Sequence, residues 1–136
     1  RRTSSAASDV YKRQFENNTY DLILCNHVLE HIPEDQKAMS ELYRVLKKGG
    51  TLIAQVPLEK QRLKTFEDER IKGRKARAKA FGQYDHVRIY GKDYYSRLEN
   101  VGFKTKAFDL ISKLKPAEII SFGLQKEKIP VAVKNL

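Results

Sequence analysis

The stretch YDLILCNHVLEH, residues 20–31, decides the fold of this 136-residue chain. Its first half, Tyr20–Cys25, is an apolar run of the kind that forms a buried β-strand, and it ends abruptly in polar residues. Ligands of open α/β sheets bind at the carboxyl ends of the strands. The polar residues that follow the run, Asn26 and His27, are therefore placed where a binding site is expected.

The rest of the chain alternates between helical and strand-like patterns. Pro33 and two acids begin an amphipathic helix, Gly49-Gly50 are expected to stop it, and Thr51–Val56 follows as a second strand that Pro57 ends. Four further elements are expected: a helix over Lys92–Asn100, a strand over Phe103–Leu110, a short helix over Pro116–Phe122 and a strand over Ile129–Val133. This order predicts an α/β fold with parallel crossover connections.

Residues 20–31, together with RVLKKGGTLI at residues 44–53, resemble the middle of a class I S-adenosylmethionine-dependent methyltransferase of the type 11 kind. The family usually has Lys-Pro-Gly-Gly where this chain has Lys47-Lys48-Gly49-Gly50. The resemblance implies a partial Rossmann-like sheet, mostly parallel with a reversed last strand and flanked by helices. It also implies S-adenosylmethionine as cofactor, held near Asn26, His27 and Cys25, and a substrate pocket bordered by Pro57.

A second resemblance concerns FGQYDHVRIYG, residues 81–91, which is similar to a loop in a bacterial subgroup of these enzymes. The resemblance implies that this loop covers the active-site face. His86 is then a candidate catalytic proton acceptor, and Arg88 a candidate grip for a carboxylate or phosphate, with His31 as a further substrate contact. The same residues also fit a structural role, in which a His–Asp or Arg–Asp hydrogen bond anchors the loop.

The chain divides into a short tail and one domain. Residues 1–14 have few apolar side chains and no periodicity, and residues 8–14 resemble a translated sequencing adapter, so we expect a disordered or non-native tail. Residues 15–136 are expected to be the C-terminal part of a methyltransferase domain, with a basic helical insertion at 59–80. None of the seven glycines forms a G-x-G loop after a strand. We therefore expect an N-terminally truncated fragment, inactive as given, that self-associates through an exposed strand edge.

The composition indicates which kinds of binding partner and which cellular compartment to expect. The net charge is +10, and residues 60–79 hold nine lysines and arginines against three acids. A solvated helix face or a lid over a small or anionic acceptor explains this segment better than nucleic-acid binding, because aromatic residues are not interleaved. The alternative is a non-catalytic, methyltransferase-like binding module whose basic helix contacts nucleic acid or an acidic surface. A single cysteine and the absence of an apolar targeting or membrane-spanning segment predict a cytoplasmic protein.

Residues 27–31 also fit H-x-x-E-H, a zinc-peptidase motif. That motif needs a helix that carries both histidines on one face. Here it follows a strand directly, and Pro33 limits any helix through it. From the sequence we therefore expect no metal site at these residues.

Overall fold

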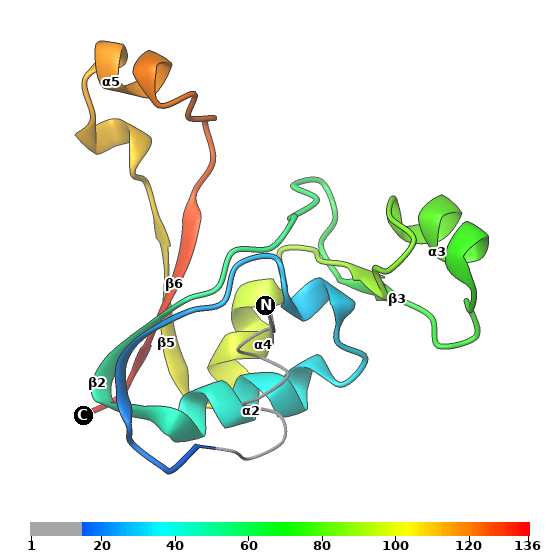
Figure 1. Ribbon diagram of the computed structural model, residues 1–136, viewed down its shortest axis with the longest axis horizontal. Helices are drawn as coiled ribbons and strands as arrows, with labels where there is room; N and C mark the ends of the chain where they lie inside the picture. The colour runs from blue at the N-terminus through cyan, green and yellow to red at the C-terminus, as the bar shows by residue number, and fades with distance from the viewer. Residues whose placement is uncertain (1–14) are drawn as a thin grey trace, which may run out of the picture.

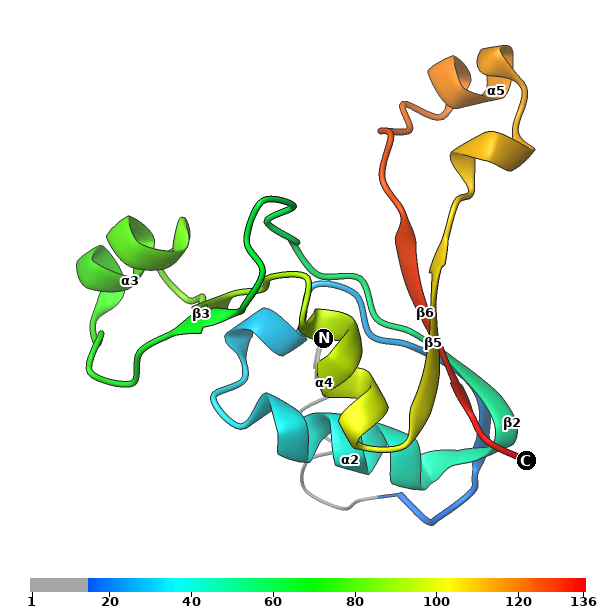
Figure 2. The same cartoon turned by 180° about the vertical axis from the view of Figure 1, so that it is seen from behind.

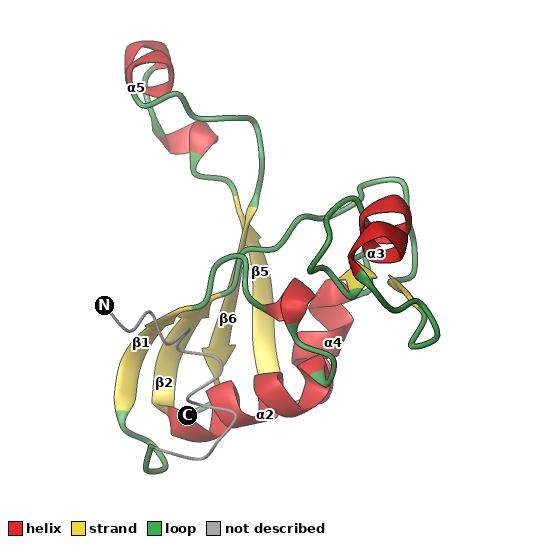
Figure 3. Ribbon diagram, turned by 45° about the vertical axis from the view of Figure 1, so that its right-hand side comes forward, coloured by secondary structure: helices red, strands yellow, loops and turns green. Residues whose placement is uncertain are grey.

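The computed structural model describes residues 15–136, so the expected tail at residues 1–14 lies outside the described part of the chain. The main sheet has the strand order β1-β2-β6-β5 (Figure 3), with bounds Tyr20–Leu24, Leu46–Ile53, Ile129–Lys134 and Phe103–Phe108 respectively. β1 and β2 are parallel, and β6 is antiparallel to both of its neighbours. Three strands therefore run in one direction and the last is reversed, which confirms the predicted α/β sheet.

One face of the sheet is covered by two helices, α2 at Asp35–Val45 and α4 at Tyr94–Asn100 (Figure 1). α2 begins after Pro33, as predicted. Its apolar residues recur at helical spacing, so they gather on the side that faces the sheet. The buried set from this helix is Ala38, Met39, Leu42 and Val45. These side chains form one cluster with residues of β2 and α4, and each large one contributes roughly 1.5–3 kcal/mol through burial.

β1 differs from the other strands because its outward face is apolar. Ile23 and Cys25 point into the core, whereas Leu22 and Leu24 are 54% and 60% exposed. Alternate residues of a strand point to opposite faces, so the two leucines lie on the face of β1 opposite the core. Within the described residues β1 pairs with β2 alone and forms an edge of the sheet.

The double glycine has a different role from the one predicted. Instead of stopping α2, Gly49 and Gly50 lie within β2, whose register with β1 shifts at this point. Gly49 has a positive φ of 75°, and a Cβ on Gly50 would lie 2.8 Å from the Lys47 carbonyl oxygen. α2 itself ends at Val45, where the Lys134 ammonium group donates to the carbonyls at the helix end. The prediction of a glycine C-cap was therefore wrong, because a lysine from the last strand closes this helix.

The expected helical insertion at 59–80 is helical only near its end. α3 spans Arg74–Phe81, and the preceding residues form loops and a short strand, β3, at Phe66–Glu67. β3 pairs with β4 at Arg88–Ile89, so the insertion folds as a small module beside the main sheet (Figure 2). In this segment strand pairing outweighs helical propensity, because β3 pairs with β4, which belongs to the 81–91 loop.

The segment between β5 and β6, residues 109–128, extends away from the sheet as an arm (Figures 1 and 2). It carries a short 3-10 helix, η2, at Ile111–Lys113 and α5 at Pro116–Ser121. β6 begins at Ile129, so Pro130 is its second residue, near the strand start. β6 lies inside the sheet, between β2 and β5.

Candidate functional site

The loop after β1 is held against the end of β2 by three hydrogen bonds. Backbone amides of Cys25 and His27 donate to the carbonyls of Ile53 and Gln55, at 2.8 and 2.7 Å. The Asn26 side-chain oxygen accepts from the Gln55 amide at 3.1 Å. His27 has a positive φ of 53°, so the chain turns sharply there before the 3-10 helix η1 at Leu29–His31. These bonds place Asn26 and His27 at the carboxyl edge of the two parallel strands.

Among the three residues expected near a cofactor, the structure separates one from the other two. Asn26 and His27 are exposed at the edge of the sheet. Cys25 is 2% exposed and packs in the core, and burial raises the pKa of its thiol to about 12. The Cys25 side chain therefore packs beneath the loop and does not reach the edge of the sheet, since it alternates with Leu24, and its contact with a cofactor stays a prediction.

A cavity of about 920 Å³ opens beside His27, and we call it the arm cavity. One wall is the segment that follows β2, from Gln55 to Leu58, and the other is formed mainly by the arm between β5 and β6. Gln55 donates to the Glu127 carboxylate at 2.7 Å, so a side-chain hydrogen bond ties the two walls together. The remaining lining residues are Lys60, Tyr95, Ala107, Asp109, Gln125, Lys126 and Lys128. Sequence reasoning found Pro57 and His27 in this set but missed Gln55 and the arm, whose residues carry no motif.

A second cavity of about 200 Å³, the loop pocket, lies on the other side of Pro57. It is lined by Glu30 and by residues of the 81–91 loop, including Gly82, His86 and Arg88. The His86 ring packs edge-on against His31, with ring centroids 4.7 Å apart. The structure thus brings together the two histidines that the sequence proposed for acceptor contact, in a pocket separate from the arm cavity.

For Arg88 the sequence allowed two roles, a grip for an anion and an anchor of the 81–91 loop, and the geometry is that of the anchor. The side chain is 2% exposed. Its guanidinium donates to the backbone carbonyls of Leu29, Ile32 and Pro33, at 2.9, 2.5 and 2.8 Å. It also donates to the Glu67 carboxylate at 2.9 Å. Because the hydrogen-bond donors of this guanidinium are used by protein partners, its position does not support the binding of an anionic substrate.

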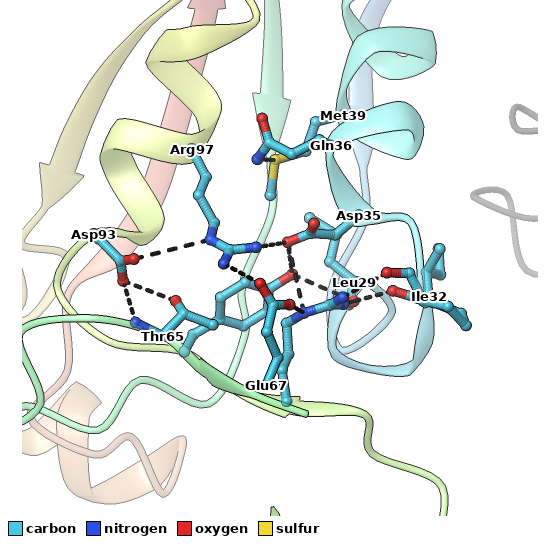
Figure 4. A network of polar contacts seen from close by, with 12 residues as sticks. Leu29, Ile32, Asp35, Gln36, Met39, Thr65, Glu67, Asp93 and Arg97 are labelled. Atoms are coloured by element: carbon cyan, nitrogen blue, oxygen red, sulfur yellow. Dashed lines mark hydrogen bonds and ion pairs between the residues drawn. The ribbon is translucent and has the colours of Figure 1, made fainter. Parts of the chain in front are cut away.

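Arg88 contacts Asp35 and Glu67, in a network of buried and partly exposed charges that joins the insertion to the body of the domain. Figure 4 shows Asp35, Glu67 and Arg97 of this network. Asp35, at the start of α2, accepts from the Tyr90 hydroxyl and from the Arg97 guanidinium, both at 2.8 Å. Arg97 bridges onward to Glu67 at 2.5 Å. We call Asp35, Glu67, Arg88, Tyr90 and Arg97 the anchor network. Each charge in it has an opposite charge or a hydrogen-bond partner, as buried charges require.

Several known proteins with similar sequence are methyltransferases. Residues 2–54 match the family described as "Methyltransferase domain". A segment of 52 residues is 33% identical to phosphoethanolamine N-methyltransferase 2 of Caenorhabditis elegans, and covers 38% of this chain and 12% of that enzyme. The chain thus corresponds to a small part of the length of the curated relatives it matches.

The described fold is also found in solved methyltransferase structures. A putative methyltransferase from Bacillus halodurans aligns with a TM-score of 0.55 at 20% identity, over 94% of this chain and 70% of that one. Phosphoethanolamine N-methyltransferase 2 of Haemonchus contortus, crystallised with phosphomonomethylethanolamine and S-adenosylhomocysteine, aligns with a TM-score of 0.54 at 15% identity, over 94% and 36%. At these identities the likeness concerns the fold alone.

The chain therefore carries methyltransferase-family sequence in residues 2–54 and has the fold of the class I S-adenosylmethionine-dependent methyltransferases, as the sequence resemblance predicted. Among the described residues, no helix is both long enough and apolar enough to cross a lipid bilayer.

Proposed function

We propose that this chain is the acceptor-binding part of an S-adenosylmethionine-dependent methyltransferase. In this proposal the cofactor lies against the exposed Asn26 and His27, and the methyl acceptor occupies the arm cavity. The observation that carries it is the opening of the arm cavity directly at His27, at the carboxyl edge of parallel strands. S-adenosylmethionine supplies an activated methyl group, so the protein has mainly to align the acceptor with it and to exclude water.

The arm cavity supports a small acceptor that carries a phosphate and an amine. Three lysines, Lys60, Lys126 and Lys128, line it and would attract an anionic group, while the carboxylates of Asp109 and Glu127 would attract a cation. The relatives named for phosphoethanolamine act on an acceptor of this class. A proton acceptor is required only if the amine arrives protonated, and His86, predicted for that task, faces the loop pocket beyond Pro57.

The test is a titration of the isotopically labelled chain with S-adenosylhomocysteine and, separately, with phosphomonomethylethanolamine, followed by NMR. We expect the first ligand to shift the amide signals of Asn26 and His27, and the second those of Gln55 and Glu127. Lys104, exposed on β5, serves as the internal control. Shifts confined to residues remote from the carboxyl edge would contradict the proposal, as would unchanged spectra at millimolar concentrations of both ligands.

We further propose that the chain as given binds the cofactor weakly and transfers methyl groups poorly. Two observations support this. In the described residues no glycine-rich turn follows β1 or β2, although such a turn holds the cofactor in related sheets. The bare apolar face at Leu22 and Leu24 also indicates surface that further structure normally covers. A calorimetric titration that gave micromolar affinity for S-adenosylmethionine would overturn this proposal.

The alternative, a binding module without catalysis, is favoured by the charge of α3. Arg74, Lys75 and Lys79 on this helix are exposed. If they contact nucleic acid or an acidic surface, the affinity must fall steeply as salt rises, because counterions are released on binding. Fluorescence anisotropy with a labelled single-stranded oligonucleotide at two salt concentrations decides between the functions. Tight, salt-sensitive binding together with no response to S-adenosylhomocysteine would favour the module.

A further inference from the structure

The loop pocket contains a buried carboxylate that nothing in the protein neutralises fully. Glu30 is 2% exposed, and both of its carboxylate oxygens lack a hydrogen-bond partner within the described residues. The polar atoms near it are imidazole nitrogens: His27 Nδ1 lies 3.3 Å and His31 Nε2 3.9 Å from Oε1. Removing an ionised carboxylate from water without such bonds is strongly unfavourable. The fold therefore holds an acid in a position that a bound cation would make favourable.

We propose that Glu30, His31 and His86 bind a divalent transition-metal ion, of which Zn²⁺ is the best fit. Ligand atoms from these three residues lie within 4.8 Å of one another. Two ligands of a tetrahedral zinc ion, at bond lengths of about 2.0–2.2 Å, lie roughly 3.4 Å apart. Small side-chain rotations would therefore close the three groups around one ion. Two imidazoles and one carboxylate form a ligand set used by zinc in catalytic sites.

The second ring nitrogen of His31, Nδ1, has the hydrogen-bond partners that are usual for a metal-binding histidine. His31 Nδ1 lies 3.3 Å from the backbone carbonyl oxygen of Asp85 and 3.4 Å from its carboxylate. Donation of the Nδ1 proton to these oxygens leaves Nε2 unprotonated and directed toward Glu30. Such a carboxylate–histidine arrangement fixes the tautomer and ring orientation of metal-binding histidines.

The arrangement differs from the helical zinc-peptidase motif H-x-x-E-H, which residues 27–31 match in sequence only. His27 lies in a left-handed turn before η1, so the two histidines of the motif are not on one helix face. The third ligand, His86, comes from the 81–91 loop instead. That loop is brought to Glu30 by the hydrogen bond from the Val87 amide to the Glu30 carbonyl, at 2.9 Å. The loop pocket beside Glu30 and His86 would leave room for a water molecule or an oxygen atom of a ligand as the fourth ligand.

Metal binding is tested on the full chain without a histidine tag, first freed of metal with a chelator. Calorimetric titration with Zn²⁺ should give one equivalent at micromolar or lower Kd, and Co²⁺ should give the visible absorption bands of a four- or five-coordinate ion. Zn²⁺ should also raise the thermal midpoint of the chain. This measurement uses neither methyl donor nor acceptor, so its outcome is independent of the proposed methyl transfer.

Two substitutions decide which residues bind the ion. Glu30→Gln and His86→Asn should each weaken Zn²⁺ binding by 100-fold or more and abolish the thermal shift. The matched control is Glu41→Gln, which removes a buried carboxylate paired with Arg44 on α2, and should leave the Zn²⁺ affinity unchanged. Asp85→Ala should weaken binding by 10–100-fold through His31.

The proposal is overturned if the wild-type chain takes up no Zn²⁺ or Co²⁺. It is also overturned if both ligand variants, folded by circular dichroism, bind Zn²⁺ as the wild type does. Binding of Mg²⁺ in preference to Zn²⁺ would contradict the assignment to a transition metal, because imidazole ligands favour the latter.

Discussion

Two groups of charges meet at the segment from Leu29 to Pro33, and they differ in one respect. In the anchor network, the carboxylate of Asp35 has two hydrogen-bond donors, and the guanidinium of Arg88 reaches three backbone carbonyls and Glu67 (Figure 4). In the loop pocket, the equally buried carboxylate of Glu30 has none. Satisfied buried charges are those of a structural joint. A buried carboxylate without hydrogen-bond donors indicates a binding site for a ligand, and at Glu30 the proposed ligand is a cation.

The two groups are also physically linked. Arg88 binds the carbonyl oxygen of Leu29, one residue before Glu30, and it lies on β4, two residues after His86. Through Arg88, which also lines the loop pocket, the anchor network therefore holds both halves of that pocket in place. Substitutions on the two sides should affect stability in opposite directions.

The largest effect is expected at Arg88. Arg88→Met should lower the free energy of unfolding by about 3–5 kcal/mol, because it leaves buried carbonyls and carboxylates without their partner. Urea denaturation at pH 7 measures this. Arg70→Met, a substitution of an exposed arginine on the same insertion, is the control and should leave the midpoint unchanged. Equal midpoints for the two variants would show that the network is not structural.

A smaller loss is expected when the network loses one negative charge. Asp35→Asn keeps the side-chain shape but removes the charge that faces Arg97 and Arg88, and should cost about 3 kcal/mol. The same denaturation experiment applies, and Glu34→Gln on the exposed turn before α2 is the comparison. No loss in the Asp35 variant would mean that the arginines are compensated by Glu67 alone.

Glu30 should respond in the opposite sense. In the metal-free chain, Glu30→Gln should raise the free energy of unfolding by about 1 kcal/mol, because it removes a desolvated charge that has no hydrogen bond. With saturating Zn²⁺ the order should reverse, since the ion stabilises the wild type alone. Thermal denaturation with and without Zn²⁺ measures both effects. A destabilised metal-free variant would indicate that protein groups already neutralise Glu30.

The smallest effect concerns acid stability through Glu67. Burial raises the pKa of this carboxyl group, but hydrogen bonds and charges from Arg97 and Arg88 outweigh it and lower the pKa below 4.5. A lowered folded-state pKa stabilises the fold above the unfolded value, and that contribution disappears as the pH falls through the folded-state pKa. The stability gap between wild type and Glu67→Gln should therefore be present at pH 7 and shrink below about pH 4.5. An unchanged gap at pH 3 would contradict this linkage.

The strands and helices of the body were predictable because hydrophobic spacing reports them locally. The alternation around Ile23, the helical spacing of Met39 and Leu42, and the polar loop at Asn26 and His27 lie in short windows of sequence. Where a partner distant in sequence decides the outcome, the prediction differed from the structure. Lys134 closes α2 in place of Gly49, and β4 pairs with β3 inside a segment expected to be helical.

The roles of the site residues divide in the same way. The sequence by itself placed Asn26 and His27 at the end of a strand, because a short hydrophobic run that stops in polar residues is typical of a buried strand and the loop that follows it. It could not decide that Arg88 is a buried joint, that Cys25 faces the core, or that Glu30 is enclosed beside His31 and His86. Burial and pairing depend on which distant segments meet, and only the packed chain brings residues 81–91 against the loop after β1.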